Sequence, residues 1–392
     1  MIDKTKVVIT KCHRWSYFEW FLLGLYKLEK SGEIDLCIRN NIGSYFLSKC
    51  SNEFVSGCIR KAISFFERDS YNLCGYIKGK QNNKKIFCID SADSPFIFNR
   101  SDLENSDIYF KMQYPVDLDS ESQFFYLTDD IKIPWLDYAL DSKEQGNMPT
   151  PFDMTTGYRK KIKPLMVGTR ELSKSISYKA LRNAYDNYLK NQTVLKDKKY
   201  MCYFGDSKGP VASPKAVHFN EDKESELMKK YEGRINHPNE KRAIVAEILK
   251  EKYQDADVRI IHRGNSDSGN RHINAEPIPL DQFCKHISRF QYNINVSGYR
   301  LSIPNRFIES FMVGTAIITD KLHVRWYKDF ENEVVETIEM GYLTNERVKW
   351  SDFTNLILNI SENSPNSVIN SYNSKWSPEA VAKYIIDTIK ES

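Results

Sequence analysis

The chain has 392 residues, of which 41% are hydrophobic and 28% are charged, and its formal net charge is +4. This length is too great for one small core and favours two domains, and the composition is that of a globular protein. The slight excess of basic over acidic residues suits an anionic small ligand or an anionic membrane surface. It argues against a nucleic-acid partner, because the Lys and Arg residues are spread out and largely matched by acids.

The 8 cysteines are scattered and form no CxxC pair. We therefore expect reduced thiols in a cytoplasmic protein, and neither a disulfide framework nor a zinc site. The longest apolar stretch near the start of the chain, WFLLGLYKL, is too short to span a bilayer. Any membrane contact is expected to be peripheral, at the inner face of a membrane.

The first part of the chain alternates predicted strands with predicted helices, which is typical of a Rossmann-like domain. The strands are expected at 6–10, 34–38, 84–90, 107–114 and 123–130, and the helices at 17–30 and 41–75. Loops that follow strands in such sheets bind ligands. Asp90 and Asp93 are therefore candidates, with Lys111 as a weaker one on the same side. Asp129–Asp130 resembles a metal-binding acidic pair, but a solvated turn is the favoured interpretation.

Residues 141–163 interrupt the alternation with Gly, Pro, Thr and a basic run, which indicates a linker. A second alternating half follows. Its strands are expected at 163–170, 199–205, 257–264 and 316–319, and its helices at 177–190, 239–253, 278–290 and 377–392. The sequence thus predicts an α/β protein with one Rossmann-like domain at 1–155, a second at 156–376, and a C-terminal helix at 377–392 that packs back across the lobes.

The stretch from Phe290 to Tyr327 organises the second half, because it reads as strand, loop, helix and strand. Residues 292–296 alternate apolar and polar side chains, which predicts a strand that Gly298 ends. Ser302 is expected to cap the next helix, with Pro304 in its first turn. Gly314 is expected to stop that helix.

Three loops with glycine or basic residues follow strands of this half, at 168–170, 262–264 and 298–306. A parallel sheet would bring them together, and a diphosphate needs backbone N–H donors and guanidinium groups. Arg170, Arg263 and Arg306 fit this task, although each one alone could form a surface ion pair. Arg306 and Glu309 are three positions apart and share one face of a helix.

Several of these residues carry a resemblance to a known family. The pattern comprises Tyr292, Gly298, Arg306–Phe307, Gly314 and Trp326–Tyr327, together with Val167–Arg170 and Ala92–Pro95. It resembles the sugar-nucleotide-binding core of glycosyltransferase family 90, which includes protein O-glucosyltransferases, capsule-associated transferases and lipopolysaccharide-modifying transferases. The spacing of Ser302, Arg306 and Glu309 also resembles the exostosin-type donor motif.

This resemblance implies a GT-B fold, in which two Rossmann-like domains face each other across a cleft. It implies a hexosyl- or pentosyltransferase that uses a nucleotide sugar, most often a UDP-sugar, and needs no metal or other cofactor. The acceptor would be a hydroxyl group of a glycan, glycolipid or protein in polysaccharide or lipopolysaccharide biosynthesis. Asp93 would be the general base of an inverting reaction, although an Asx-turn role before Pro95 stays open.

The strand-end loops and the resemblance together give the candidates for each side of the site, although a packed or solvated role is the favoured interpretation of His262. The donor-binding candidates are Gly168, Thr169, Arg170, His262, Arg263, Gly298, Ser302, Arg306 and Glu309. Asp90 and Lys111 would lie on the acceptor side. Two alternatives remain: a nucleotide-sugar epimerase of the same fold, and a non-catalytic protein that binds polysaccharide or nucleic acid.

Overall fold

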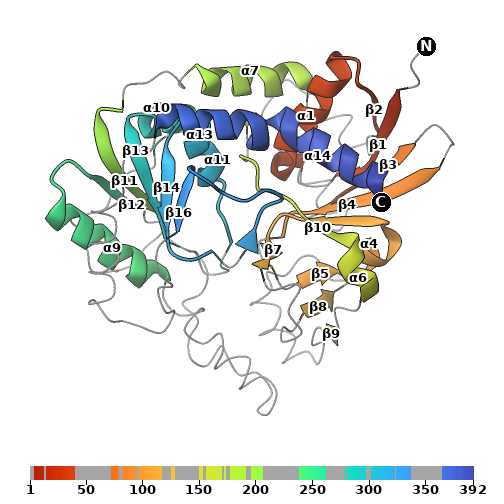
Figure 1. Cartoon of the computed structure of the whole chain (residues 1–392), viewed down its shortest axis with the longest axis horizontal. Helices are drawn as coiled ribbons and strands as arrows, with labels where there is room; N and C mark the ends of the chain where they lie inside the picture. The colour runs from red at the N-terminus through yellow and green to blue at the C-terminus, as the bar shows by residue number, and fades with distance from the viewer. Residues whose placement is uncertain are drawn as a thin grey trace, which may run out of the picture. The chain divides into compact units, whose positions relative to one another are not determined.

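The structure, a computed structural model, divides the chain into two units. Unit 1 comprises Met1–Asp186, Val324–Lys328 and Ser374–Ser392, and unit 2 comprises Asn187–His323 and Asp329–Asn373. The described residues are 4–12, 15–39, 72–78, 83–92, 95, 97–116, 125–128, 150–152, 156–169, 172–173, 177–190, 196–205, 238–261, 278, 280–296, 302–322, 324–336 and 364–392. Each unit contains a sheet with helices beside it, so the α/β class predicted from the sequence is confirmed (Figure 1).

The main sheet of unit 1 has six strands in the order β10-β6-β4-β3-β1-β2. These strands are β1 (Thr5–Cys12), β2 (Ile34–Ile38), β3 (Asn72–Lys78), β4 (Lys84–Asp90), β6 (Ile108–Lys111) and β10 (Ile162–Pro164). All neighbours are parallel except β3, which runs antiparallel to both β1 and β4. The sheet is therefore mixed. The prediction of a helix up to residue 75 is wrong for 72–75, which lie in β3, and the rest of that helix lies outside the described residues.

Smaller elements complete unit 1. They are η1 (Trp15–Tyr17), α4 (Arg100–Asn105), α6 (Thr156–Lys161), the sheet of β5 (Ile97–Asn99), β8 (Phe125–Thr128) and β9 (Thr150–Phe152), and the pair of β7 (Tyr114–Pro115) with β15 (Val324–Arg325). Residues 156–163 were expected to belong to the linker, but they form α6 and most of β10, and of the strand expected at 163–170 only residues 163–164 lie in β10. Because β10 pairs with β6, unit 1 extends beyond the boundary expected near residue 155.

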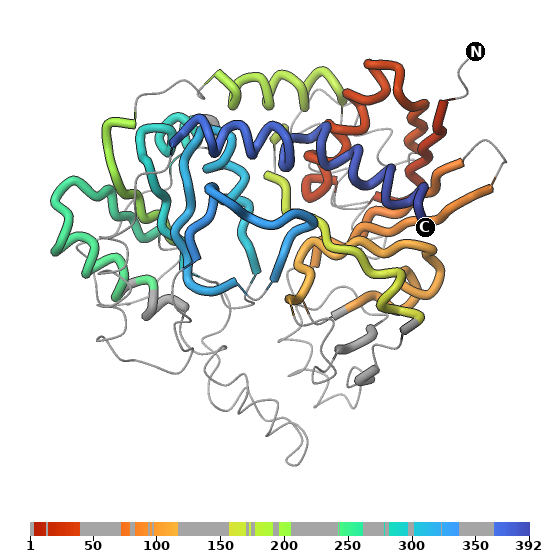
Figure 2. The backbone as a smooth tube through the Cα atoms, in the orientation of Figure 1, coloured from red at the N-terminus to blue at the C-terminus, as the bar shows by residue number. Residues whose placement is uncertain are grey.

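The two ends of the chain meet in unit 1. Helix α1 (Glu19–Lys30) lies beside helix α14 (Pro378–Glu391), as the red and blue segments of Figure 2 show. A Cβ atom added to Gly24 in α1 would lie 1.9 Å from the carbonyl oxygen of Pro378. The indole Nε1 of Trp20 donates to the carbonyl oxygen of Trp376 at 3.1 Å. The C-terminal helix is thus packed on the N-terminal one, with a glycine at the point of closest approach.

The sheet of unit 2 has five strands in the order β12-β11-β13-β14-β16, and every neighbouring pair is parallel. The strands are β11 (Lys198–Gly205), β12 (Asp257–Ile261), β13 (Phe290–Asn295), β14 (Ala316–Thr319) and β16 (Val334–Glu336). The helices of unit 2 are α9 (Pro238–Lys252), α10 (Leu280–Ile287), α11 (Arg306–Phe311) and α13 (Pro365–Ser371). The chain passes from one unit to the other within α7 (Tyr178–Leu189) and within the π-helical turn η4 (Tyr372–Trp376). Strand–helix alternation is what the sequence predicted for this part.

The stretch around α11 confirms one local prediction and corrects another. Gly314 has a φ of 71° and follows the turn after α11, so it does supply the stop. The expected cap by Ser302 is wrong, because the N-cap position is Asn305 and Pro304 precedes the helix. Among the described residues, no helix is long and apolar enough to cross a membrane.

The contact between α1 and α14 generates a stability prediction. Replacing Gly24 by Ala adds helix propensity worth about 1 kcal/mol, but its methyl group meets backbone atoms of α14 that cannot rotate away. Overpacking of this kind costs about 1–3 kcal/mol. We expect the clash to dominate, so that Gly24→Ala lowers the urea midpoint of unfolding. Lys390→Ala, at an exposed position of α14, is the control, and an unchanged midpoint for Gly24→Ala would contradict the packing described here.

Candidate functional site

The carboxyl edge of the unit 2 sheet contains a reversal of strand order. Strand β11 has β12 on one side and β13 on the other, so the chain passes from β12 back across β11 to form β13. In open α/β sheets, the connections on the two sides of such a reversal lie on opposite faces of the sheet, which leaves a crevice at the carboxyl ends of the strands. Ligands of open α/β sheets bind at such switch points.

Arg306 is the basic side chain that the described structure places beside this switch. It is the first residue of α11, and its Nη1 donates a hydrogen bond to the carbonyl oxygen of Tyr203, near the end of β11. Burial lowers the pKa of Arg306, and the charge of Glu309 opposes that effect. The hydrogen bond to Tyr203 uses one of the five N–H donors of a guanidinium group.

Glu309 lies on the same turn of α11 and is only 3% exposed. Its Oε1 accepts a hydrogen bond of 2.8 Å from Nδ2 of Asn305. The sequence expectation that Arg306 and Glu309 are neighbours is therefore confirmed. Together they place a half-buried cation and a buried carboxylate next to the strand switch.

Polar side chains also line the ends of the next two strands. Asn295 ends β13 and donates through Nδ2 to Oγ1 of Thr319, which ends β14, at 3.0 Å. Oγ1 of Thr319 in turn donates to Oδ1 of Asp320 at 3.1 Å. All three residues are buried. The sequence analysis did not name these three residues as candidates, although a polar residue at the end of each apolar strand could have indicated them.

Several predicted site residues lie outside the described residues, and their roles stay predictions. They are Asp93, Asp129–Asp130, Arg170, His262, Arg263 and Gly298. Ser302 is described and half-buried, and it lies four residues before Arg306.

Gly168 and Thr169 were expected to open the second domain, but they belong to unit 1, shortly after β10. Both are buried, and a Cβ atom on Gly168 would lie 2.3 Å from the Cβ of Trp20 in α1. The position therefore requires glycine for close packing within unit 1. Whether either residue contacts a donor stays a prediction.

In unit 1 the other candidates, Asp90 and Lys111, form a buried ion pair. They are register partners at the carboxyl ends of β4 and β6, and Nζ of Lys111 lies 2.6 Å from Oδ2 of Asp90. Their side chains are 2% and 0% exposed. The hydroxyl of Tyr109 donates to the same oxygen at 2.7 Å. Burial, followed by the charge of Asp90, raises the pKa of Tyr109 well above its usual range, so the phenol stays a donor.

The second oxygen of Asp90 holds the loop that follows β4. Oδ1 accepts a hydrogen bond of 2.7 Å from the backbone N–H of Ala92. Asp90 therefore links Lys111, Tyr109 and the start of the loop that carries Asp93. These contacts give Asp90 a role in positioning the strand ends and the start of the loop. Tyr109 and Lys111 occupy alternate positions of β6, so their side chains share one face of the sheet, and this spacing was the signal in the sequence.

Comparisons with known proteins give distant similarity only. No family model matches the chain, and no curated protein matches its sequence. One similar crystal structure is described as WaaG, a glycosyltransferase involved in lipopolysaccharide biosynthesis, with 10% identity, a TM-score of 0.34 and 96% coverage of both chains. Another is a glycosyl transferase of family 9 from Veillonella parvula, with 12% identity, a TM-score of 0.25 and coverage of 99% of this chain and 96% of that one. At these values the likeness assigns no activity to this chain.

The buried pair predicts a strong response to the loss of one partner. Lys111→Met leaves the Asp90 carboxylate buried without its cation, and such a change costs about 3–5 kcal/mol. We expect a clear fall in the free energy of unfolding measured with urea. The double variant Asp90→Asn/Lys111→Met should lose less than the sum of the two single variants, because no lone charge is then buried. Lys383→Met, which removes an exposed pair with Glu33, should change little. If the loss of the double variant equalled the sum of the two single losses, a direct interaction between Asp90 and Lys111 would be contradicted.

Proposed function

We propose that the chain is a glycosyltransferase that moves a sugar from a nucleotide-diphosphate donor to a hydroxyl group of a glycan, glycolipid or protein. The observation that carries this proposal is the charged pair Arg306–Glu309 beside the strand switch of an all-parallel sheet. Switch points of parallel sheets bind nucleotides, and a half-buried guanidinium suits a diphosphate. The donor site is therefore assigned to unit 2.

Each charged group has a specific task in this assignment. The guanidinium of Arg306 would balance the negative charge that grows on the diphosphate as it leaves, because a positive charge in a water-poor site stabilises that charge strongly. The carboxylate of Glu309 would accept hydrogen bonds from hydroxyl groups of the ribose or the sugar. Arg170 and Arg263 are proposed as further cations, UDP as the preferred nucleotide, and no metal at the diphosphate.

Asp93 is proposed as the general base that takes the proton from the acceptor hydroxyl, with inversion at the sugar carbon. The support comes from its neighbours, since the backbone N–H of Ala92 donates a hydrogen bond to Asp90, and Asp90 forms an ion pair with Lys111. A loop fixed at its start can present a carboxylate with little loss of entropy. The acceptor would then bind on the side of unit 1.

The donor assignment predicts the effect of removing the guanidinium. Arg306→Ala should weaken UDP binding in calorimetry by about 1.5–3 kcal/mol, the value of a hydrogen bond to a charged group. Circular dichroism checks that the variant folds, and Glu309→Gln is a second variant that should weaken a UDP-sugar more than UDP. The control is Arg289→Ala, because Arg289 is exposed before β13 and pairs with Asp197. If Arg306→Ala bound UDP as tightly as the parent chain does, the proposal that the donor binds at this edge of the sheet would be wrong.

The base assignment predicts a loss of turnover without a loss of donor affinity. Asp93→Asn keeps the shape of the side chain but cannot accept the proton, so turnover should fall about a hundred- to ten-thousandfold. The assay measures free nucleotide released from a panel of sugar nucleotides with glycan acceptors. Asp35→Asn, at an exposed position of β2, is the control. Near-normal turnover of Asp93→Asn would contradict the assignment, and an isomerised sugar nucleotide without free nucleotide would instead identify an epimerase.

A further inference from the structure

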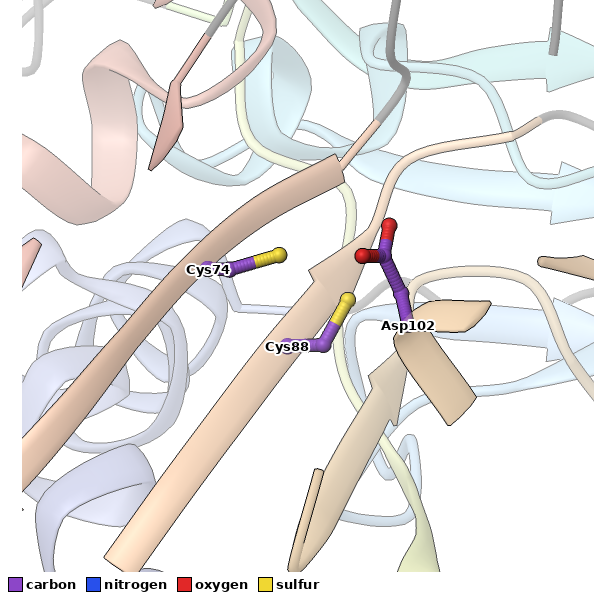
Figure 3. Close-up of side chains that lie close together, drawn as sticks. All are labelled: Cys74, Cys88 and Asp102. Atoms are coloured by element: carbon purple, nitrogen blue, oxygen red, sulfur yellow. The ribbon is translucent and has the colours of Figure 1, made fainter. Parts of the chain in front are cut away.

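Three side chains of metal-binding type come together in unit 1, as Figure 3 shows. They are Cys74 on β3, Cys88 on β4 and Asp102 on α4. Their sulfur and carboxylate oxygen atoms all lie within 4.8 Å of one another. The ligand atoms of a tetrahedral zinc site lie roughly 3.5–4 Å apart, given the usual Zn–S and Zn–O distances. Small side-chain rotations therefore suffice to bring the three groups onto one ion.

The backbone fixes where these three residues lie. Cys74 and Cys88 are direct partners in the antiparallel register of β3 and β4, so both side chains leave the same face of the sheet. Asp102 lies in the first turn of α4, and its backbone N–H donates to the side chain of Asn99 at 2.8 Å, which caps that helix. The cluster is thus assembled from two strands and a capped helix, which are rigid elements.

A second layer of contacts orients the carboxylate of Asp102. Nζ of Lys11 lies 3.1 Å from its Oδ2, and Nδ2 of Asn72 donates to the same oxygen at 2.7 Å. Partners of this kind orient the ligands of metal sites. Cys88 is 1% exposed, while Cys74 is half-buried and the side chain of Asp102 is 13% exposed. One side of the cluster is therefore shielded, and another can be reached by an ion.

The charges of the cluster balance with a divalent cation. Two thiolates and the Asp102 carboxylate carry three negative charges, and Lys11 supplies one positive charge. Two further positive charges make the cluster neutral. A divalent ion would thus replace two protons at constant charge.

We propose that Cys74, Cys88 and Asp102 bind a zinc ion, with water as the fourth ligand. Thiolates favour zinc over magnesium or calcium, and zinc also accepts a carboxylate oxygen in the same tetrahedron. The bound ion would tie the β3–β4 pair to α4. It is separate from the proposed donor site and plays no part in holding the diphosphate.

The experiment uses the full chain without a tag, reduced and freed of metal. Cobalt is titrated in first, because its thiolate charge-transfer absorption reports sulfur ligands, and zinc is then used to displace it. We expect one ion per chain. Cys74→Ser and Asp102→Asn should weaken binding by more than the ten- to hundredfold that loss of an orienting partner costs. Cys37→Ser, a half-buried cysteine on β2 outside the cluster, should bind like the parent.

Folding and oxidation are controlled in the same series. Circular dichroism confirms that each variant folds, and zinc should raise the melting temperature of the parent and of Cys37→Ser but not of Cys74→Ser. Binding that is unchanged in both Cys74→Ser and Asp102→Asn would overturn the assignment. It would also be overturned if the reduced protein took up no metal while a mild disulfide oxidant joined Cys74 to Cys88, since the pair would then be a redox couple.

Discussion

The buried ion pair of Asp90 and Lys111 is the constraint on which the carboxyl ends of β4 and β6 in unit 1 depend. Two charges with almost no exposure are tolerated only where they meet each other and further hydrogen bonds. The parallel register of β4 and β6 brings them together, and the hydroxyl of Tyr109 and the backbone N–H of Ala92 donate further hydrogen bonds to the Asp90 carboxylate. A slip of β6 by one residue relative to β4 would move Lys111 to the opposite face of the sheet from Asp90. The pair therefore fixes the strand ends and the start of the loop that follows.

The secondary structure was largely predictable where local patterns are strong. Strands 84–90 and 316–319 were predicted with the bounds that the structure has, because apolar residues fill them and polar residues end them. Strand β3 was missed, since its hydrophobic pattern suits a helix equally well and only pairing with β1 and β4 decides between the two. The position of β10 could not be foreseen either. Three residues carry little pattern, and their place depends on the pairing with β6.

The candidate site was predictable in part, for the same reason. Arg306 and Glu309 share a helix turn, so their proximity follows from spacing alone. The hydrogen bond from Arg306 to the carbonyl of Tyr203 joins residues 103 positions apart, and no local pattern reports it. The cysteine cluster is a stronger case, because its ligands come from two strands and a helix without the CxxC spacing that a sequence search uses. Gly168 shows the reverse, since a glycine that suggests a phosphate loop packs closely against Trp20.

Strand β4 connects the two proposals made for unit 1. Cys88 and Asp90 are two residues apart on it, so their side chains leave the same face, and Cys88 pairs in register with Tyr109, the residue that donates to Asp90. An ion bound to Cys88 would hold this part of β4 against β3 and α4. Asp90 lies at the end of the same segment and holds the loop of Asp93 through Ala92. Zinc would thereby reduce the freedom of the proposed base without contacting it, so a cysteine variant should affect turnover less than Asp93→Asn does and leave donor affinity unchanged.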